Sequence, residues 1–282
     1  MACYTCDDEK VLNRKNLYNL KLRDGNCTTT DVCCIPANDF IARDLTKCGT
    51  ANPEGLPRRR RTTLKSVLER EYPWRAWIYS KEDLQTPICV ASYVDSAAKA
   101  LLTTASCVSG RRPSTLVVKF TKSQNPPLGL KEVIVHKYFD RATRKNDTAL
   151  LILLSSPGEH AQPICYQHSA PPFGTTCVAV SDNETYINII IPDQKKCYSV
   201  DKNMDDTLVC TTSHAADYKP PEGAGIYCLE DQGNIPKYFL YGISLNVHKE
   251  RFSFHANVPH FAKWIVQQTP TDQPSWTWDG AR

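Results

Sequence analysis

From Glu71 onward the chain alternates between short apolar runs and turn-forming residues. The runs are rich in β-branched residues, and Pro, Gly, Asn or Asp separates them. They cover residues 74–79, 88–94, 115–120, 132–136, 148–154, 176–180, 185–191 and 238–243. Many short strands at such spacing are typical of a β-sandwich or a β-barrel. The pattern therefore predicts an all-β domain over residues 71–268.

A different periodicity appears near the C-terminus. In VPHFAKWIVQ, residues 258–267, apolar side chains recur at the spacing of one helix face. We expect a single amphipathic helix that closes the domain. Residues 269–282 are polar and contain Pro and Gly, and they are expected to form a flexible tail.

The N-terminal part of the chain has few long apolar runs, and residues 1–48 hold six of the thirteen cysteines. A region with so little core depends on disulfides for its stability. Residues 49–70 form a polar, turn-rich stretch that includes the basic run Arg58–Arg61. The expected organisation is a small disulfide-rich domain, an exposed linker and the β domain.

Composition narrows the function classes. With 282 residues and 41% hydrophobic content, the chain is large enough to bury a core, and its net charge of +4 is too mild for a nucleic-acid binder. No stretch approaches the roughly 18 apolar residues that span a bilayer. The lone CxxC of Cys3 and Cys6 lacks the second pair or the histidines of a zinc site, so we predict no metal and no cofactor.

The cysteine content indicates disulfides formed in an oxidising, extracellular compartment. The chain opens MACYTC, without the charged and apolar regions of a signal peptide. We therefore expect a secreted protein whose signal peptide has been removed.

Several segments together carry a family resemblance. EYPWRAWIY (71–79), ICVASYV (88–94) followed by LLTTASCV (101–108), EVIVHKYF (132–139) followed by NDTALLIL (146–153), GAGIYC (223–228) and NVPHFAKWI (257–265) occur in order along the chain. This series resembles the clip-domain serine protease homologues, the non-catalytic branch of an arthropod extracellular family. The resemblance implies two six-stranded trypsin-like β-barrels with a C-terminal helix, preceded by a disulfide-knotted clip domain.

Acyl transfer by a serine protease needs a nucleophilic hydroxyl, an imidazole that accepts its proton and a carboxylate that orients the imidazole. On the family pattern Asp147 matches the carboxylate, Ser106 stands at the imidazole position, and the reactive serine maps to Glu222 or Gly223. A serine hydroxyl cannot act as a general base at neutral pH. Two prolines before Glu222 also remove backbone N–H donors from the oxyanion loop. The sequence therefore predicts a pseudoprotease.

The resemblance also implies a set of covalent features. The expected disulfides are Cys89–Cys107, Cys48–Cys165, Cys177–Cys228, Cys197–Cys210, Cys3–Cys27 and Cys6–Cys34, which leaves Cys33 for a partner upstream of residue 1. Arg61, twelve residues before Pro73, is the expected cleavage site. The sequons at Asn26 and Asn183 are expected to be glycosylated.

By family analogy the protein is a cofactor or regulator in an innate-immune protease cascade of the haemolymph, in melanisation through prophenoloxidase or in complement-like opsonisation. Its expected partners are other clip-domain proteases or homologues, cascade zymogens and opsonins, and cleavage is expected to favour oligomerisation. The alternative is a binding module that recognises microbial surfaces or another protein and has no role in proteolysis.

Overall fold

The structure, a computed structural model, describes residues 48–51, 65–67, 71–121, 124–158, 161–167, 169–181, 185–213, 220–232 and 235–269. The chain divides into two units, Met1–Asp44 and Leu45–Arg282, and every described residue belongs to the second. The clip domain with Cys3–Cys27, Cys6–Cys34 and Cys33, the cleavage candidate Arg61, the sequons Asn26 and Asn183, and the tail beyond Thr269 all lie outside the described residues.

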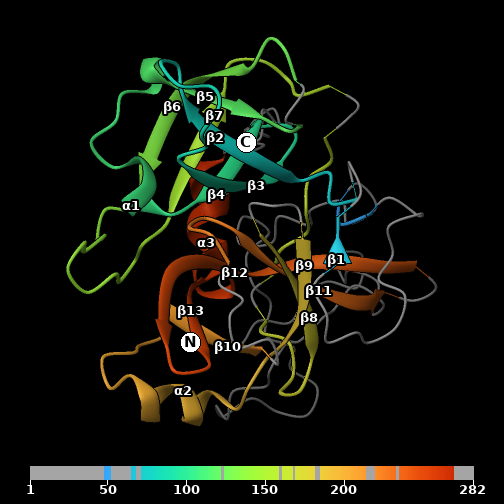
Figure 1. Cartoon of the computed structure of the whole chain (residues 1–282), viewed down its shortest axis with the longest axis vertical. Coiled ribbons are helices and arrows are strands. Elements are labelled where there is room, and N and C mark those ends of the chain that lie inside the picture. The colour runs from blue at the N-terminus through green and yellow to red at the C-terminus, as the bar shows by residue number, and fades with distance from the viewer. Residues whose placement is uncertain are drawn as a thin grey trace, which may run out of the picture. The chain divides into compact units, whose positions relative to one another are not determined.

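The first six long strands close into a barrel, shown in the upper half of Figure 1. They are β2 (Arg75–Ser80), β3 (Cys89–Asp95), β4 (Ala100–Thr103), β5 (Leu116–Lys119), β6 (Leu128–Val135) and β7 (Ala149–Leu153). Their order is β2-β3-β4-β7-β6-β5, with antiparallel pairing throughout. Apolar side chains such as Ile78, Leu101 and Leu150 have no exposed surface, so the interior is a packed core.

The second barrel contains the remaining long strands. They are β8 (Thr176–Val180), β9 (Thr185–Ile190), β10 (Leu208–Ser213), β11 (Gly225–Gln232), β12 (Ile235–Lys249) and β13 (Phe252–Asn257). Their order is β9-β10-β13-β12-β11-β8, and pairing of β8 with β9 closes the ring. The two-residue strand β1 (Lys65–Ser66) adds to β9. The prediction of two six-stranded barrels is thus confirmed.

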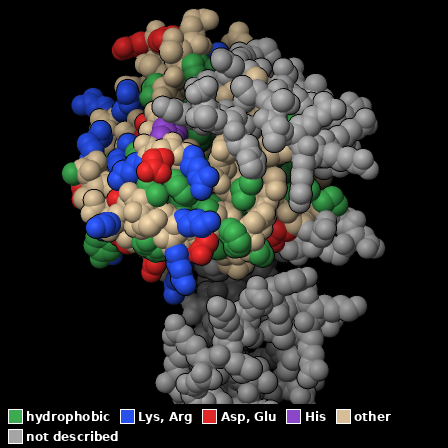
Figure 2. Space-filling view, turned by 60° about the horizontal axis from the view of Figure 1, so that its bottom comes forward, with side chains coloured by type: hydrophobic (Ala, Val, Ile, Leu, Met, Phe, Trp, Pro, Cys, Tyr) green, Lys and Arg blue, Asp and Glu red, His purple; other side chains and the backbone are tan. Residues whose placement is uncertain are grey.

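Short helices complete the domain: α1 (Ala105–Val108), the 3-10 helix Pro113–Thr115, α2 (Gln194–Val200) and α3 (Val258–Gln268). Helix α3 covers the residues expected to be helical, and it buries Val258, Phe261, Ala262 and Ile265. Among the described residues, no helix is both long enough and apolar enough to cross a membrane. Figure 2 shows basic and acidic side chains interspersed over the described part of one face.

Four aromatic side chains connect the start of the first barrel with the second. Tyr72 and Trp74 precede β2, whereas Tyr227 and Tyr238 lie on β11 and β12. The ring centroids of Tyr72 and Trp74 are each 5.6–5.7 Å from those of Tyr227 and Tyr238. Because all four side chains are buried, this cluster makes the two barrels share one core.

Disulfides tie the described strands and loops together. The structure forms Cys48–Cys165, Cys89–Cys107, Cys177–Cys228 and Cys197–Cys210, which are the pairs that the resemblance implied for this region. Cys48 thereby belongs to the second unit, where its carbonyl also accepts a hydrogen bond from Lys237 Nζ at 3.0 Å.

His255 is an ionisable side chain in the middle of the second barrel. It is fully buried on β13, and its Nε2 lies 2.8 Å from Thr211 Oγ1 on β10. Burial, with a smaller contribution from His248, lowers the pKa of His255 to about 3. A proton on Nδ1 would have no acceptor among the described residues, so the folded protein holds this imidazole neutral.

This burial predicts a specific acid sensitivity. The unfolded chain protonates His255 below about pH 6.5, whereas the folded chain does so only near pH 3. The free energy of unfolding should therefore fall by about 1.4 kcal/mol per pH unit, from this residue, as pH drops from 6.5 toward 3. His255→Gln keeps a hydrogen-bonding side chain for Thr211 but does not titrate. Urea unfolding at several pH values should give a shallower slope for the variant, and equal slopes would contradict the assignment.

Candidate functional site

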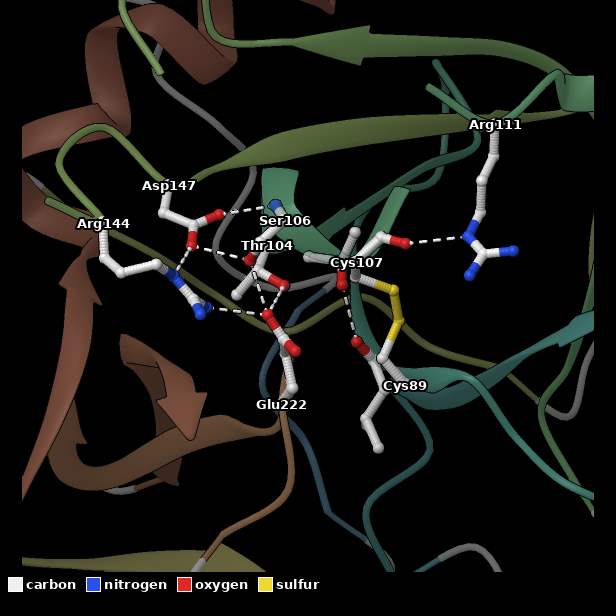
Figure 3. Close-up of a disulfide and its surroundings, with 10 residues drawn as sticks. Cys89, Thr104, Ser106, Cys107, Arg111, Arg144, Asp147 and Glu222 are labelled. Atoms are coloured by element: carbon white, nitrogen blue, oxygen red, sulfur yellow. Dashed lines mark hydrogen bonds and ion pairs between the residues drawn. A yellow bond between two sulfur atoms is a disulfide. The ribbon is translucent and has the colours of Figure 1, made fainter. Parts of the chain in front are cut away.

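The site begins at the end of β4, where the chain turns into α1. The backbone N–H of Ser106 donates to Asp147 Oδ1 at 2.8 Å, and its hydroxyl donates to Asp147 Oδ2 at 2.7 Å (Figure 3). Asp147 immediately precedes the β7 segment, its side chain is fully buried, and β4 and β7 are neighbours in the barrel. Strand pairing therefore brings together two of the predicted site residues.

The third predicted position comes from the second barrel. Glu222, just before β11, points its carboxylate at the first barrel, and its Oε1 lies 2.5 Å from Ser106 Oγ and 3.2 Å from Thr104 Oγ1. The backbone carbonyl of Glu222 accepts a hydrogen bond from Val90 at 3.0 Å. Of the two alternatives for this position, Glu222 is the residue whose side chain faces Ser106.

Gly223 has a separate structural role. Its φ is +81°, and a Cβ atom there would lie 2.0 Å from the Val90 carbonyl oxygen and 2.8 Å from Thr103 Oγ1. Only glycine fits a backbone that has this conformation and approaches another strand so closely. Gly223 thus fixes how near Glu222 comes to Ser106.

Sequence reasoning missed Arg144, which completes the site. It lies in the loop between β6 and β7, and its Nε contacts Asp147 Oδ2 at 2.5 Å. Its Nη2 contacts Glu222 Oε1 at 2.7 Å and donates to the Leu245 carbonyl of β12 at 3.0 Å. The loop sequence DRATRKND offers three basic residues, and nothing in that pattern indicates which of them turns inward.

Arg144 supplies the positive charge that the two carboxylates share. The hydroxyl of Ser106 carries one proton, so it donates to only one carboxylate at a time although both lie within hydrogen-bond distance. The planar guanidinium provides separate N–H donors for both, a geometry that an ammonium could not match. The Arg144 and Glu222 side chains are 25% and 28% exposed, so solvent reaches the outer edge of the network.

Backbone donors in the loop before β11 are largely engaged. Pro220 and Pro221 carry no N–H. The N–H of Gly223 donates to the Ser244 carbonyl at 2.8 Å, and the N–H of Ala224 donates to the Pro221 carbonyl at 3.1 Å. At most one N–H from these five residues is therefore available to an acyl oxygen, whereas an oxyanion hole of this type uses a pair.

Residues 64–265 match the model of the trypsin family. The chain belongs to the trypsin family. A comparison with curated protein sequences finds no match. Membership of the trypsin family agrees with the two closed antiparallel barrels and with the position of the Ser106–Asp147–Glu222 cluster where they meet.

The histidines that the structure describes in this trypsin-family domain are engaged elsewhere. His136 packs against Phe261 and Trp264 of α3, with ring centroids 5.4 and 5.0 Å apart, and burial lowers its pKa together with the nearby His260 and Lys137. His248 contacts Ser253 and Asn246, and His255 lies inside the second barrel. Within the described ranges, no three His, Cys, Asp or Glu side chains are grouped to hold a metal ion.

The close approach at Gly223 gives a matched test of how the site is built. Gly223→Ala and Gly110→Ala both place a side chain at positive φ, which costs about 1–2 kcal/mol. The Gly110 position has no atom within 4 Å of the added Cβ, whereas the Gly223 position clashes with Val90. Gly223→Ala should therefore cost a further ~3 kcal/mol of unfolding free energy, measured by urea denaturation. Equal losses for the two variants would show that the approach to Val90 is not tight.

Proposed function

We propose that this chain is a secreted, non-catalytic member of the trypsin family that regulates an extracellular protease cascade. The observation that carries the proposal is the network of Arg144, Asp147, Ser106 and Glu222 at the meeting point of the barrels. A glutamate side chain faces the serine that occupies the imidazole position, and the Arg144 guanidinium binds both neighbouring carboxylates. The network contains a hydroxyl that could act as a nucleophile, but no neutral base lies beside it.

The backbone supports the same conclusion. A tetrahedral intermediate needs N–H donors aimed at its oxyanion, and removal of a single donor from such a hole lowers turnover about 100-fold or more. In this loop Pro220 and Pro221 have no N–H, and Gly223 and Ala224 donate to carbonyls of the protein itself. A variant with one triad side chain restored would therefore still lack the N–H donors that stabilise the tetrahedral intermediate.

The remaining parts of the proposal follow the resemblance of the sequence to clip-domain homologues. The segment before Cys48 forms the clip domain, Arg61 is the cleavage site, and Asn26 and Asn183 carry glycans. The disulfides and the absence of a membrane-crossing helix among the described residues are compatible with secretion. The protein acts as a cofactor, in melanisation or opsonisation, through contacts with cascade zymogens or other clip-domain proteins.

Loss of catalysis predicts a clear biochemical result. The wild-type protein should not be labelled by a fluorophosphonate probe, and Ser106→His should hydrolyse no peptide substrate, because the nucleophile and the oxyanion donors are still missing. Trypsin labelled in parallel is the positive control. Labelling of the wild type that disappears in Ser106→Ala would identify Ser106 as a nucleophile and overturn the proposal.

The cascade role predicts that cleavage in the basic run matters although the protein cleaves nothing. Replacing Arg58–Arg61 with glutamines should prevent processing by a trypsin-like protease and reduce phenoloxidase activation in haemolymph depleted of the native protein. Secretion and thermal stability of the glutamine variant, measured in parallel, are the controls for folding. A glutamine variant that supports the cascade as well as the parent would refute the processing step.

The same cleavage should leave the product in one piece. On one side of the run, Cys48 is bonded to Cys165, and Gly49 exchanges backbone hydrogen bonds with Pro163 and Tyr238. On the other side, β1 pairs with β9. The cleaved parent should therefore migrate as one species without reductant and as two with it, whereas a Cys48→Ser, Cys165→Ser variant should separate in denaturing gels without reductant.

A further inference from the structure

The loop between β6 and β7 reaches across to the second barrel. We call residues 137–146 the strap. Its base continues the barrel ladder through the hydrogen bond from His136 N–H to the Thr148 carbonyl, at 3.0 Å. Its tip is a tight turn, in which Asp140 pairs with Lys145 and Asp140 carboxylate oxygens accept from Ala142 N–H and Thr143 Oγ1. These internal bonds make the strap a preformed unit.

Two consecutive side chains hold the strap on the second barrel. Arg144 contacts Glu222 and the Leu245 carbonyl, as described above, and Lys145 Nζ lies 2.9 Å from Asp205 Oδ2 in the loop between α2 and β10. In the described part of the chain, these two residues make all the ion pairs between the strap and the second barrel. Basic side chains on the strap therefore face acidic side chains on the opposite barrel.

The backbone of the strap is strained where it is attached. Arg144 and Asn146 have φ values of +58° and +53°, in the left-handed region that residues other than glycine seldom adopt. Such a conformation persists only where surrounding contacts hold it in place. At Arg144 these contacts are the two carboxylates and the carbonyl, so breaking them removes the reason for the local conformation.

The attached strap binds polar groups at the place where the two barrels meet. Glu222 Oε1 and the Leu245 carbonyl both accept hydrogen bonds from Arg144. Leu245 lies at an irregularity of β12, where the pairing with β13 shifts between Ser244 and Val247. Its carbonyl is thus bound by a side chain from the other barrel at a point where the β-ladder is interrupted.

From this geometry we propose that the strap is a built-in closing device, in which Arg144 covers the polar groups between the barrels and its release exposes them. The closed state is the one described here. In the open state the strap swings away as a unit, Glu222 and the Leu245 carbonyl become accessible, and Arg144 relaxes from its left-handed backbone. This conformational change involves no catalysis, so its test is independent of whether the protein hydrolyses peptides.

The two attachments differ in strength. Lys145 and Asp205 are 35% and 37% exposed, and an ion pair of that kind contributes little and is screened by salt. Arg144 binds a fully buried carboxylate as well as Glu222, and loss of such a partner has a much larger effect. Arg144 should therefore make the main contribution to holding the strap on the second barrel, and Lys145 a smaller one.

Hydrogen–deuterium exchange of the full chain, read by mass spectrometry, measures strap opening directly. Arg144→Gln should raise exchange of strap amides by about tenfold or more, whereas Lys145→Gln should raise it by no more than about fivefold. Arg141→Gln is the matched control, since Arg141 is exposed on the same strap. Amides of β7 and β13 should lose less protection than the strap amides, which separates strap release from general destabilisation.

Carboxyl footprinting gives a second measurement, the accessibility of the Glu222 carboxylate. Carbodiimide coupling of glycine ethyl ester to Glu222 should increase several-fold in Arg144→Gln, relative to the exposed Glu132 in the same sample. If Arg144→Gln does not fold, Arg144→Lys, which keeps the charge but loses the fork, should show an intermediate increase in both measurements. The proposal is overturned if the folded variants match wild type within twofold, if Arg141→Gln has the same effect, or if β7 and β13 lose protection equally.

Discussion

The carboxylate of Asp147 is the constraint on which the rest of the site depends. It has no solvent exposure, and a buried carboxylate is tolerated only when hydrogen bonds and an opposite charge compensate its lost hydration. Here the backbone N–H and the hydroxyl of Ser106 each donate a hydrogen bond to the Asp147 carboxylate, and the Arg144 guanidinium supplies the opposite charge. In a fully buried pair, removal of such a partner costs roughly 3–5 kcal/mol. The position of α1, the conformation of the strap and the orientation of Glu222 all follow from this demand.

Arg144 supplies the positive charge that a serine at position 106 does not bring. The Ser106 hydroxyl has one proton to donate and carries no charge. Without Arg144, the carboxylates of Asp147 and Glu222 would therefore share that single proton. A guanidinium with separate donors for each carboxylate relieves that repulsion. Because the cation comes from one barrel and Glu222 from the other, the compensation also links the barrels.

The sequence predicts those features that are determined by local periodicity or by covalent pairing. Short β-branched runs located most strands of the first barrel but only β8, β9 and β12 of the second. The apolar spacing of residues 258–267 located α3 within one residue. The family resemblance also implied that Ser106 and Asp147 lie together. They meet because Ser106 follows the end of β4 and Asp147 precedes the start of its antiparallel neighbour β7. The sequence left Glu222 and Gly223 as alternatives, because a spacing count cannot tell which of two adjacent residues occupies the position facing Ser106. Arg144 was beyond reach, because its direction depends on a left-handed backbone that only the facing carboxylates stabilise.

Two residues of the site, Gly223 and Asp147, are required by the fold itself. Gly223 cannot change without a clash against the Val90 carbonyl, and Asp147 cannot lose its partners without leaving a buried charge, so packing and electrostatics retain both residues whether or not the site catalyses a reaction. Ser106 and Pro220 also serve the fold: the Ser106 hydroxyl donates to Asp147, and the Pro220 carbonyl accepts from Ser244 Oγ at 3.0 Å. Preservation of the fold, including its four described disulfides, is for this reason no indication that the chemistry has been preserved.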